Sequence, residues 1–171
     1  MKDKKKWMMT ATAAVGALIG RICYECRHFT TEYYDVASDK IPEAFEGFRF
    51  VVLSDLHNYD FDQGNRKLLR AIERLKPDAV MIAGDMIDAH PGADMSAAVR
   101  MVRDLCDRWP VYFGNGNHEQ RIALYSETYG DMHARWCKAI RHPNLHLLRN
   151  QHTVIRKDGA YINIYGLELN R

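Results

Sequence analysis

From Phe48 to the carboxyl end, the hydrophobic residues of this chain follow two spacings in alternation. Short runs in which nearly every residue is apolar, such as residues 50–53, are typical of strands buried on both faces. Between these runs, apolar residues recur three or four positions apart, which indicates amphipathic helices. The pattern predicts strands over residues 50–53, 79–83 and 111–113, with helices around residues 68–75 and 95–106.

The remainder of the chain adds a longer helical segment and three further strands. The apolar spacing predicts helix from about residue 120 to residue 140, then strands over residues 145–148, 153–156 and 161–165. Lys157, Asp158 and Gly159 separate the last two strands. This is a hairpin signal, because Asp-Gly supplies the positive φ angles that a tight turn needs.

The order strand, helix, strand, helix, strand implies an α/β fold in which helices cover a parallel sheet. Ligands of such sheets bind beyond the carboxyl ends of the strands, where several loops converge. We therefore expect functional side chains in the three loops that follow the first three strands.

Each of these loops carries side chains that bind metal ions in proteins. The first contains Asp55 and His57, which are two positions apart and, in an extended backbone, point to the same side. The second contains Asp85, whose two carboxylate oxygens can bridge two ions, and the third contains Asn117 within the run Gly-Asn-His-Glu. Oxygen and nitrogen ligands without thiolates favour Mn, Fe or Zn, and a bridging carboxylate favours a two-metal centre.

The three strand ends carry Asp-x-His, Gly-Asp-x-x-Asp and Gly-Asn-His-Glu in this order. From about Phe48 to its end, the chain thereby resembles the calcineurin-like metallophosphoesterase superfamily. The resemblance implies the first half of that family's sandwich fold and a centre of two divalent metal ions. The metal ligands that it implies are Asp55, His57, Asp85 and Asn117.

The resemblance also implies roles around the substrate. Asp85 would bridge the two ions, and Asn117 would contact the substrate as well as a metal. His118 would contact the phosphate and protonate the leaving group, while Asp88 would orient the His118 ring. Metal-bound hydroxide would attack phosphorus in line, without a covalent enzyme intermediate.

The function implied is hydrolysis of phosphodiester or related phosphate-ester bonds. The basic head, the short apolar segment and the phrase GFRFVVLSDLHN most resemble the bacterial membrane-anchored phosphodiesterase branch. Two alternatives stay open: a catalytically inactive membrane-anchored binding remnant, and a lipid-linked pyrophosphatase. The substrate would accordingly be a phosphate ester, lipid-linked in the second alternative.

The sequence departs from the family's pattern near its carboxyl end. Family members supply a further histidine and a Gly-His-x-His motif from later strands, whereas this sequence stops at Arg171. Without them each metal would keep about two or three protein ligands, and an incomplete shell binds weakly. We therefore expect a C-terminally truncated chain with weak metal binding and poor activity by itself, and the function above is that of the complete enzyme.

The first 29 residues predict a targeting segment. Four lysines among the first six residues precede an uncharged stretch over residues 7–20, shorter than the roughly 20 residues that span a bilayer comfortably. We expect an uncleaved signal anchor over residues 1–29, a linker or extended segment over 30–47, and the phosphoesterase domain over 48–171. A cleaved signal peptide and a cytosolic tail are the alternatives. The excess of lysines before the segment predicts a cell-membrane protein whose domain lies outside the cytoplasm.

Composition narrows this picture without adding a site. The chain has 171 residues, 47% hydrophobic and 27% charged, as in one globular domain. Its formal net charge of +2 indicates no nucleic acid partner. Cys23 and Cys26 lack the second pair that a zinc site needs, and Cys106 and Cys137 fall in predicted helices as small hydrophobes. Physiological substrate, metal identity and oligomeric state cannot be read from the sequence.

Overall fold

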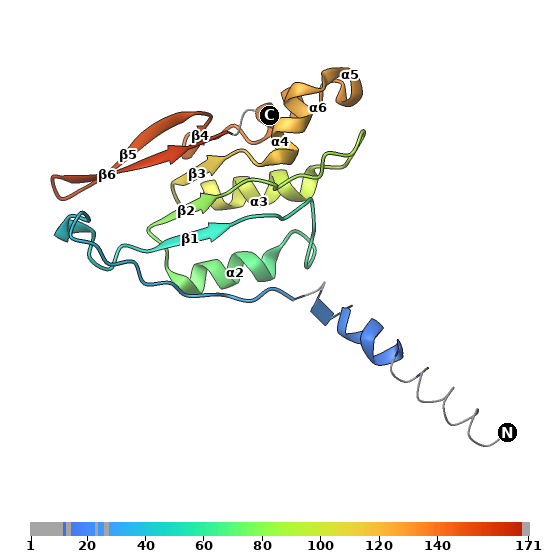
Figure 1. Cartoon of the computed structure of the whole chain (residues 1–171), viewed down its shortest axis with the longest axis horizontal. Coiled ribbons are helices and arrows are strands. Elements are labelled where there is room, and N and C mark those ends of the chain that lie inside the picture. The colour runs from blue at the N-terminus through green and yellow to red at the C-terminus, as the bar shows by residue number, and fades with distance from the viewer. Residues whose placement is uncertain (1–11, 13–14, 23, 26–27, 169–171) are drawn as a thin grey trace. The chain divides into compact units, whose positions relative to one another are not determined.

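The structure is a computed structural model that describes the chain except for residues 1–11, 13–14, 23, 26–27 and 169–171 (Figure 1). The chain divides into two compact units, Met1–Asp35 and Val36–Arg171. The predicted signal anchor falls in the first unit and lies largely outside the described residues, as do Cys23 and Cys26. Within the part that the structure describes, no helix is both long enough and apolar enough to cross a membrane.

Four parallel strands form the main sheet of the second unit, in the order β1-β2-β3-β4 (Figure 1). Their registers join Val51 to Val80, Val80 to Val111, and Val111 to Leu145. The bounds are β1 Phe50–Leu53, β2 Ala79–Ile82, β3 Val111–Gly114 and β4 Leu145–Leu148. The predicted α/β class, with a parallel sheet and flanking helices, is confirmed.

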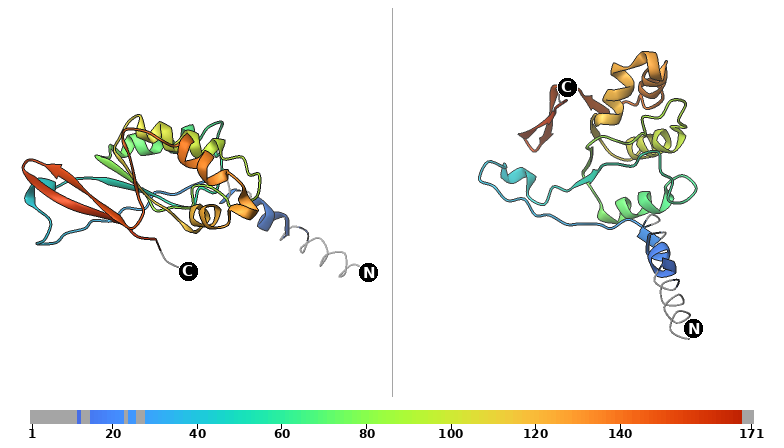
Figure 2. Two further views of the ribbon diagram at one scale, coloured as in Figure 1. Left: turned by 90° about the horizontal axis from the view of Figure 1, so that it is seen from above. Right: turned by 45° about the vertical axis from the view of Figure 1, so that its right-hand side comes forward.

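Helices α2 (Arg66–Leu75) and α3 (Ser96–Cys106) pack on one face of this sheet (Figures 1 and 2). Alternate strand residues point toward them, and Val80, Val111 and Phe113 are completely buried. The inward faces of the helices are buried as well, with Ile72 of α2 2% exposed and Met101 of α3 0% exposed, because their apolar spacing matches the helical repeat. Burial also raises the pKa of the Cys106 thiol, on α3, to about 12.

The helical stretch predicted over residues 120–140 is helical but interrupted at two points. The structure has three short helices here, α4 (Asn117–Leu124), α5 (Ser126–Tyr129) and α6 (Met132–Ala139). Tyr125, with a φ of −115°, separates α4 from α5. Gly130, with a φ of +59°, ends α5 before α6 begins. Because α4 begins at Asn117, the last residues of the third loop, residues 117–119, form the first turn of a helix.

Strands β5 (Gln151–Lys157) and β6 (Ala160–Gly166) form an antiparallel hairpin. Lys157 pairs with Ala160, so the turn consists of Asp158 and Gly159, whose φ angles are +49° and +81°. The predicted Asp-Gly turn is confirmed. Both strands are longer than expected, because pairing starts immediately beside the two-residue turn.

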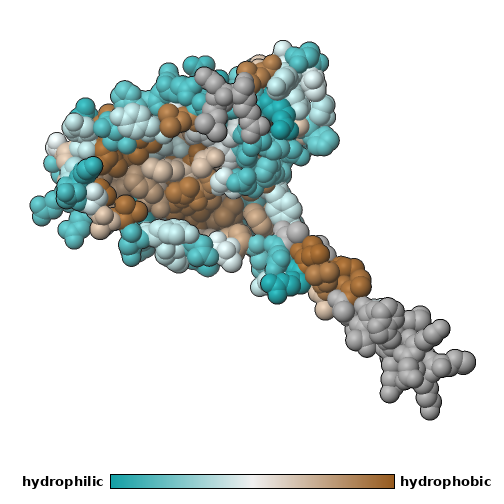
Figure 3. Space-filling model, viewed as in Figure 1, coloured by the Kyte–Doolittle hydropathy of each residue, from teal (hydrophilic) through white to brown (hydrophobic). Residues whose placement is uncertain are grey.

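The hairpin covers part of the second face of the parallel sheet (Figure 2). Ile155 from β5 packs there with Tyr112 from β3 and with Phe45 from the short helix η1 (Glu43–Phe45). Phe45 is only 5% exposed, so a residue from the segment expected to be a linker belongs to the core. Apolar side chains also show on the surface in Figure 3, and Val52 of β1 is 61% exposed.

Candidate metal centre

The loops after β1 and β2 are joined by three backbone hydrogen bonds. The N–H groups of Asp55, His57 and Asn58 donate to the carbonyl oxygens of residues 84, 85 and 86, at 3.2, 3.0 and 2.9 Å. The first loop therefore lies along the second, as expected when the carboxyl ends of neighbouring parallel strands meet at one edge.

Left-handed backbone conformations are concentrated in these loops. The φ angles are +58° at Asp55, +49° at His57, +59° at Asn58 and +53° at Asp85. The extended backbone that we expected between Asp55 and His57 is therefore wrong. Left-handed conformations of residues other than glycine are strained, and such strain is typical of functional sites.

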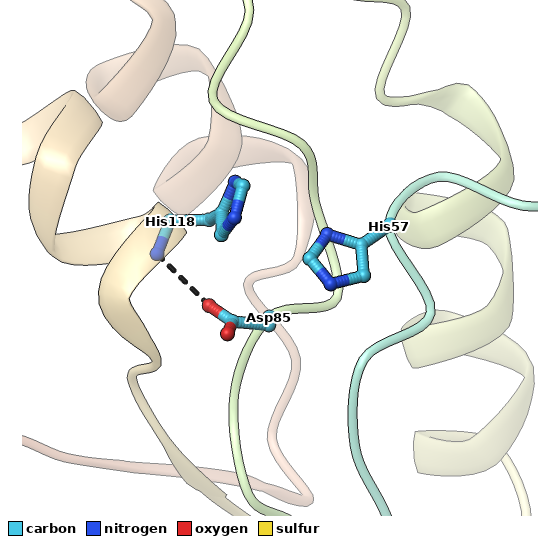
Figure 4. Close-up of side chains that lie close together, drawn as sticks. All are labelled: His57, Asp85 and His118. Atoms are coloured by element: carbon cyan, nitrogen blue, oxygen red, sulfur yellow. Dashed lines mark hydrogen bonds between the residues drawn. The ribbon is translucent and has the colours of Figure 1, made fainter.

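Three side chains come together across the three loops. Ligand atoms of His57, Asp85 and His118 all lie within 4.8 Å of one another (Figure 4). The His57 and His118 rings meet edge to face at a centroid distance of 4.6 Å. The backbone N–H of His118 donates to Oδ1 of Asp85 at 2.9 Å, the bond drawn in Figure 4. The Asp85 carboxylate is thus bonded to the first turn of α4, and it offers an oxygen within 4.8 Å of a ring nitrogen of each histidine.

The other predicted ligands lie at the edges of this group. Oδ1 of Asp55 is 3.4 Å from Nε2 of His57, and the Asp55 side chain is 64% exposed. Asn117 is the first residue of α4 and is exposed. Their roles as metal ligands stay predictions, as does the bridging role of Asp85.

The environment of His118 bears on its role. Its Nδ1 accepts a hydrogen bond from the N–H of Ala89 at 2.8 Å and is 3.3 Å from Oδ1 of Asp88. A neutral ring whose Nδ1 is an acceptor carries its proton on Nε2. In this tautomer Nε2 is a hydrogen-bond donor, which favours contact with an anionic group over coordination of a metal.

Glu119 is a residue of this site to which the sequence analysis gave no role. It is fully buried, and its carboxylate accepts hydrogen bonds from the backbone of both the second and the third loop. The only available signal was its position three residues after Gly116, at the start of a helix, where glutamate often caps the helix. Sequence spacing cannot show that it also reaches a loop more than 30 residues away.

Asparagine oxygens complete the polar surroundings. Oδ1 of Asn58 and Oδ1 of Asn115 are buried and have no hydrogen-bond partner among the described residues. Nδ2 of Asn115 donates to Oε1 of Glu168 at 2.6 Å, which ties the third loop to the segment after β6. Carboxylate groups, imidazole rings and unpaired amide oxygens are ligands suited to Mn, Fe or Zn, so the residues present fit a divalent cation.

The fold and the site together define an α/β protein with a candidate metal centre at the carboxyl edge of its sheet.

Comparison with known proteins assigns the family. Residues 48–170 match the family described as calcineurin-like phosphoesterase. This match covers well over half of the chain. The chain therefore belongs to the calcineurin-like phosphoesterase family, as its three motifs suggested.

Individual relatives carry related names. The chain is 30% identical, over 70% of its length, to a Danio rerio protein named transmembrane protein with metallophosphoesterase domain. It is 27% identical, over 74% of its length, to the Bos taurus protein of the same name. An uncharacterized metallophosphoesterase of Campylobacter jejuni is 27% identical over 75% of the chain. The chain spans 28%, 27% and 31% of the lengths of these three proteins.

Proposed function

We propose that this chain forms part of a metal-dependent hydrolase that cleaves phosphodiester or related phosphate-ester bonds at a centre of two divalent ions. The observation that carries the proposal is the convergence of His57, Asp85 and His118 from three strand ends to within 4.8 Å. Family membership supports the reaction class. We place the chain in the bacterial membrane-anchored branch, on its basic head and its GFRFVVLSDLHN phrase.

The side chains divide into two groups by their chemistry. His57 and Asp85 would hold metal, joined by Asp55 and Asn117 from the rim of the group. Bound cations would polarise the phosphoryl oxygens and activate a water for attack on phosphorus. His118 would contact the phosphate through Nε2; in its protonated form it would donate the Nε2 proton to the leaving oxygen and be left as a neutral imidazole. Oδ1 of Asp88 lies 3.3 Å from Nδ1, so in the protonated ring it would accept a hydrogen bond from that nitrogen and fix the direction of the ring.

Two substitutions test this division of roles. Asp85→Ala should empty at least one metal position and abolish metal-dependent hydrolysis of bis-p-nitrophenyl phosphate. His118→Ala should reduce turnover by roughly 100- to 10,000-fold, the usual contribution of a general acid, while retaining bound metal. The measurements are metal content by mass spectrometry and release of nitrophenol with added Mn²⁺. Equal loss of metal from both variants would contradict the assignment.

A comparison of two substrates distinguishes the phosphodiesterase from the pyrophosphatase. Hydrolysis of the diester without release of phosphate from a lipid-linked pyrophosphate supports the phosphodiesterase, and the reverse result supports the pyrophosphatase. Absence of Mn²⁺-dependent hydrolysis of either compound by the wild-type chain would favour the binding remnant. These outcomes are distinct because Asp85→Ala supplies the background rate.

We also propose a membrane location, with residues 1–29 as signal anchor, residues 30–47 as a connecting segment whose Phe45 packs into the core, and residues 48–171 as the catalytic part. The basic, then uncharged, order of the first 20 residues supports it, as do the relatives named transmembrane proteins. Fractionation of cells should place the protein in the membrane pellet. Digestion by protease added to spheroplasts should then show that residues 48–171 lie outside the cytoplasm. Complete protection would contradict that orientation.

A further inference from the structure

The Glu119 carboxylate accepts hydrogen bonds from four backbone N–H groups. Oε2 accepts hydrogen bonds from Asp85 at 2.8 Å and from Gly116 at 2.9 Å. Oε1 accepts from Met86 at 2.9 Å and from Ile87 at 3.3 Å. The side chain has no exposed surface, so water cannot replace these bonds. One side chain therefore joins the loop that presents Asp85 to the first turn of α4.

The second loop is held from its other side as well. Its carbonyl groups at residues 84–86 accept the hydrogen bonds from the first loop, at 2.9–3.2 Å. The segment over residues 84–87 therefore directs N–H groups toward Glu119 and carbonyl groups toward the loop that contains His57. Through this segment Glu119 is linked to all three loops that carry candidate ligands.

Removal of this carboxylate would leave several donors unsatisfied in a buried place. A buried N–H group without a hydrogen-bond partner is unfavourable, so the loops would rearrange to reach water. We expect this rearrangement to affect Asp85 most, because a hydrogen bond to Glu119 holds its left-handed backbone. A small rotation there would move its carboxylate away from His57 and from the N–H of His118.

We propose that Glu119 is a positioning residue that sets the relative placement of the three ligand loops and thereby the affinity of the site for divalent metal. The inference rests on the proposed function, because it presumes that Asp85 and His57 bind metal. Glu119 itself contacts neither metal nor substrate. It acts through the backbone of residues 85–87 and of Gly116.

Glu119→Gln tests the proposal with little change of volume. Glutamine offers one acceptor oxygen, so its amide group would face two of the four N–H donors. We expect the 171-residue chain carrying this change to bind Mn²⁺ about 10- to 100-fold more weakly, the usual effect of losing a partner that orients metal ligands. Electron paramagnetic resonance of free Mn²⁺ gives the affinity. Visible absorption of bound Co²⁺ should also shift, because it reports the arrangement of the ligands.

Asp60→Asn is the matched control. The Asp60 carboxylate also accepts backbone hydrogen bonds, from Asp62, Gly64 and Asn65, but none of these residues lies in a ligand loop. This variant should lose a similar kind of loop anchor and keep the Mn²⁺ affinity and Co²⁺ spectrum of the wild type. Circular dichroism at the temperature of the titration establishes that each variant is folded.

The outcomes separate the two proposals. Wild-type binding that Asp85→Ala abolishes and Glu119→Gln leaves unchanged would overturn the positioning role alone. Failure of the wild type to bind Mn²⁺ would overturn both proposals.

Should Glu119→Gln not fold, hydrogen exchange of the wild-type protein decides: the amides of Met86, Ile87 and Gly116 should exchange slowly without metal. Exchange as fast as at the exposed Asp158 turn would overturn the inference.

Discussion

Two glycines determine how closely the second and third loops approach. A Cβ atom on Gly84 would lie 2.1 Å from the backbone nitrogen of Gly116, and one on Gly116 would lie 2.3 Å from Oδ1 of Asp85. Both distances are far too short for atoms that are not bonded to each other, so a larger residue at either position would move the backbone that presents Asp85. The φ of Gly84, +85°, adds a second requirement for glycine.

Alanine substitutions at Gly92 and Gly84 separate two contributions to the free energy of unfolding: the left-handed backbone conformation and the steric overlap between the loops. Gly92 has a similar φ of +76° but open space where its Cβ would be. We expect Gly92→Ala to lower the free energy of unfolding by about 1–2 kcal/mol, the cost of the left-handed conformation. Gly84→Ala adds a steric overlap and should lower it by roughly 2–5 kcal/mol. Urea denaturation of both variants measures the difference, and equal losses would mean that the loops separate without cost.

Among the elements, the β5–β6 hairpin illustrates how alternation divides a strand between two environments. On β6, Tyr161, Asn163 and Tyr165 are exposed, whereas Ile162 and Ile164 between them pack against the second core. Successive side chains of a strand point to opposite faces, so one face of the hairpin covers the parallel sheet and the other is in water. The hairpin thereby stabilises the face of the sheet opposite α2 and α3.

Substitutions on the two faces should have unequal effects. Ile155 is 9% exposed and packs with Phe45 and Tyr112, so Ile155→Ala should lower the free energy of unfolding by roughly 2–5 kcal/mol. Asn163→Ala, on the exposed face of the partner strand, should change it by less than about 0.5 kcal/mol. Chemical denaturation followed by circular dichroism tests the pair. A small effect of Ile155→Ala would show that the hairpin is not part of the cooperative core.

At the scale of the whole molecule, the second unit contains both hydrophobic cores and every candidate ligand. Val36–Arg171 includes the parallel sheet, its helices, the hairpin and the three loops. Phe45 extends the folded part of the chain to the amino side of Phe48, where the hydrophobic pattern placed its start. A domain needs a core of its own to fold independently, and this unit has one.

A chain that begins at Val36 should accordingly retain the fold and the metal site. We expect its unfolding midpoint to stay within roughly 3 °C of that of the full chain, because the cores are unchanged. Its Mn²⁺ affinity should equal that of the full chain, whereas membrane association should be lost. Thermal circular dichroism, Mn²⁺ titration and membrane fractionation check these outcomes. Loss of a cooperative transition would show that residues 1–35 are required for folding.

Local features of this protein could be predicted from its sequence. The strand over residues 50–53 and the Asp-Gly hairpin turn depend on hydrophobic alternation and turn chemistry, which neighbouring residues specify. The order of elements then placed three polar loops at one edge of a parallel sheet. His57, Asp85 and His118 could therefore be selected before any distance between them was known.

Features that depend on contacts between distant segments could not be predicted in this way and became visible in the folded chain. The left-handed backbone at Asp55 and His57 follows from hydrogen bonds to the second loop, and Phe45 is buried by strands that come later in the chain. Glu119 and Asp85 are 34 positions apart, yet the carboxylate of one holds the backbone of the other. Sequence spacing carries no information about such pairs, because their free energy arises only when folding removes both partners from water.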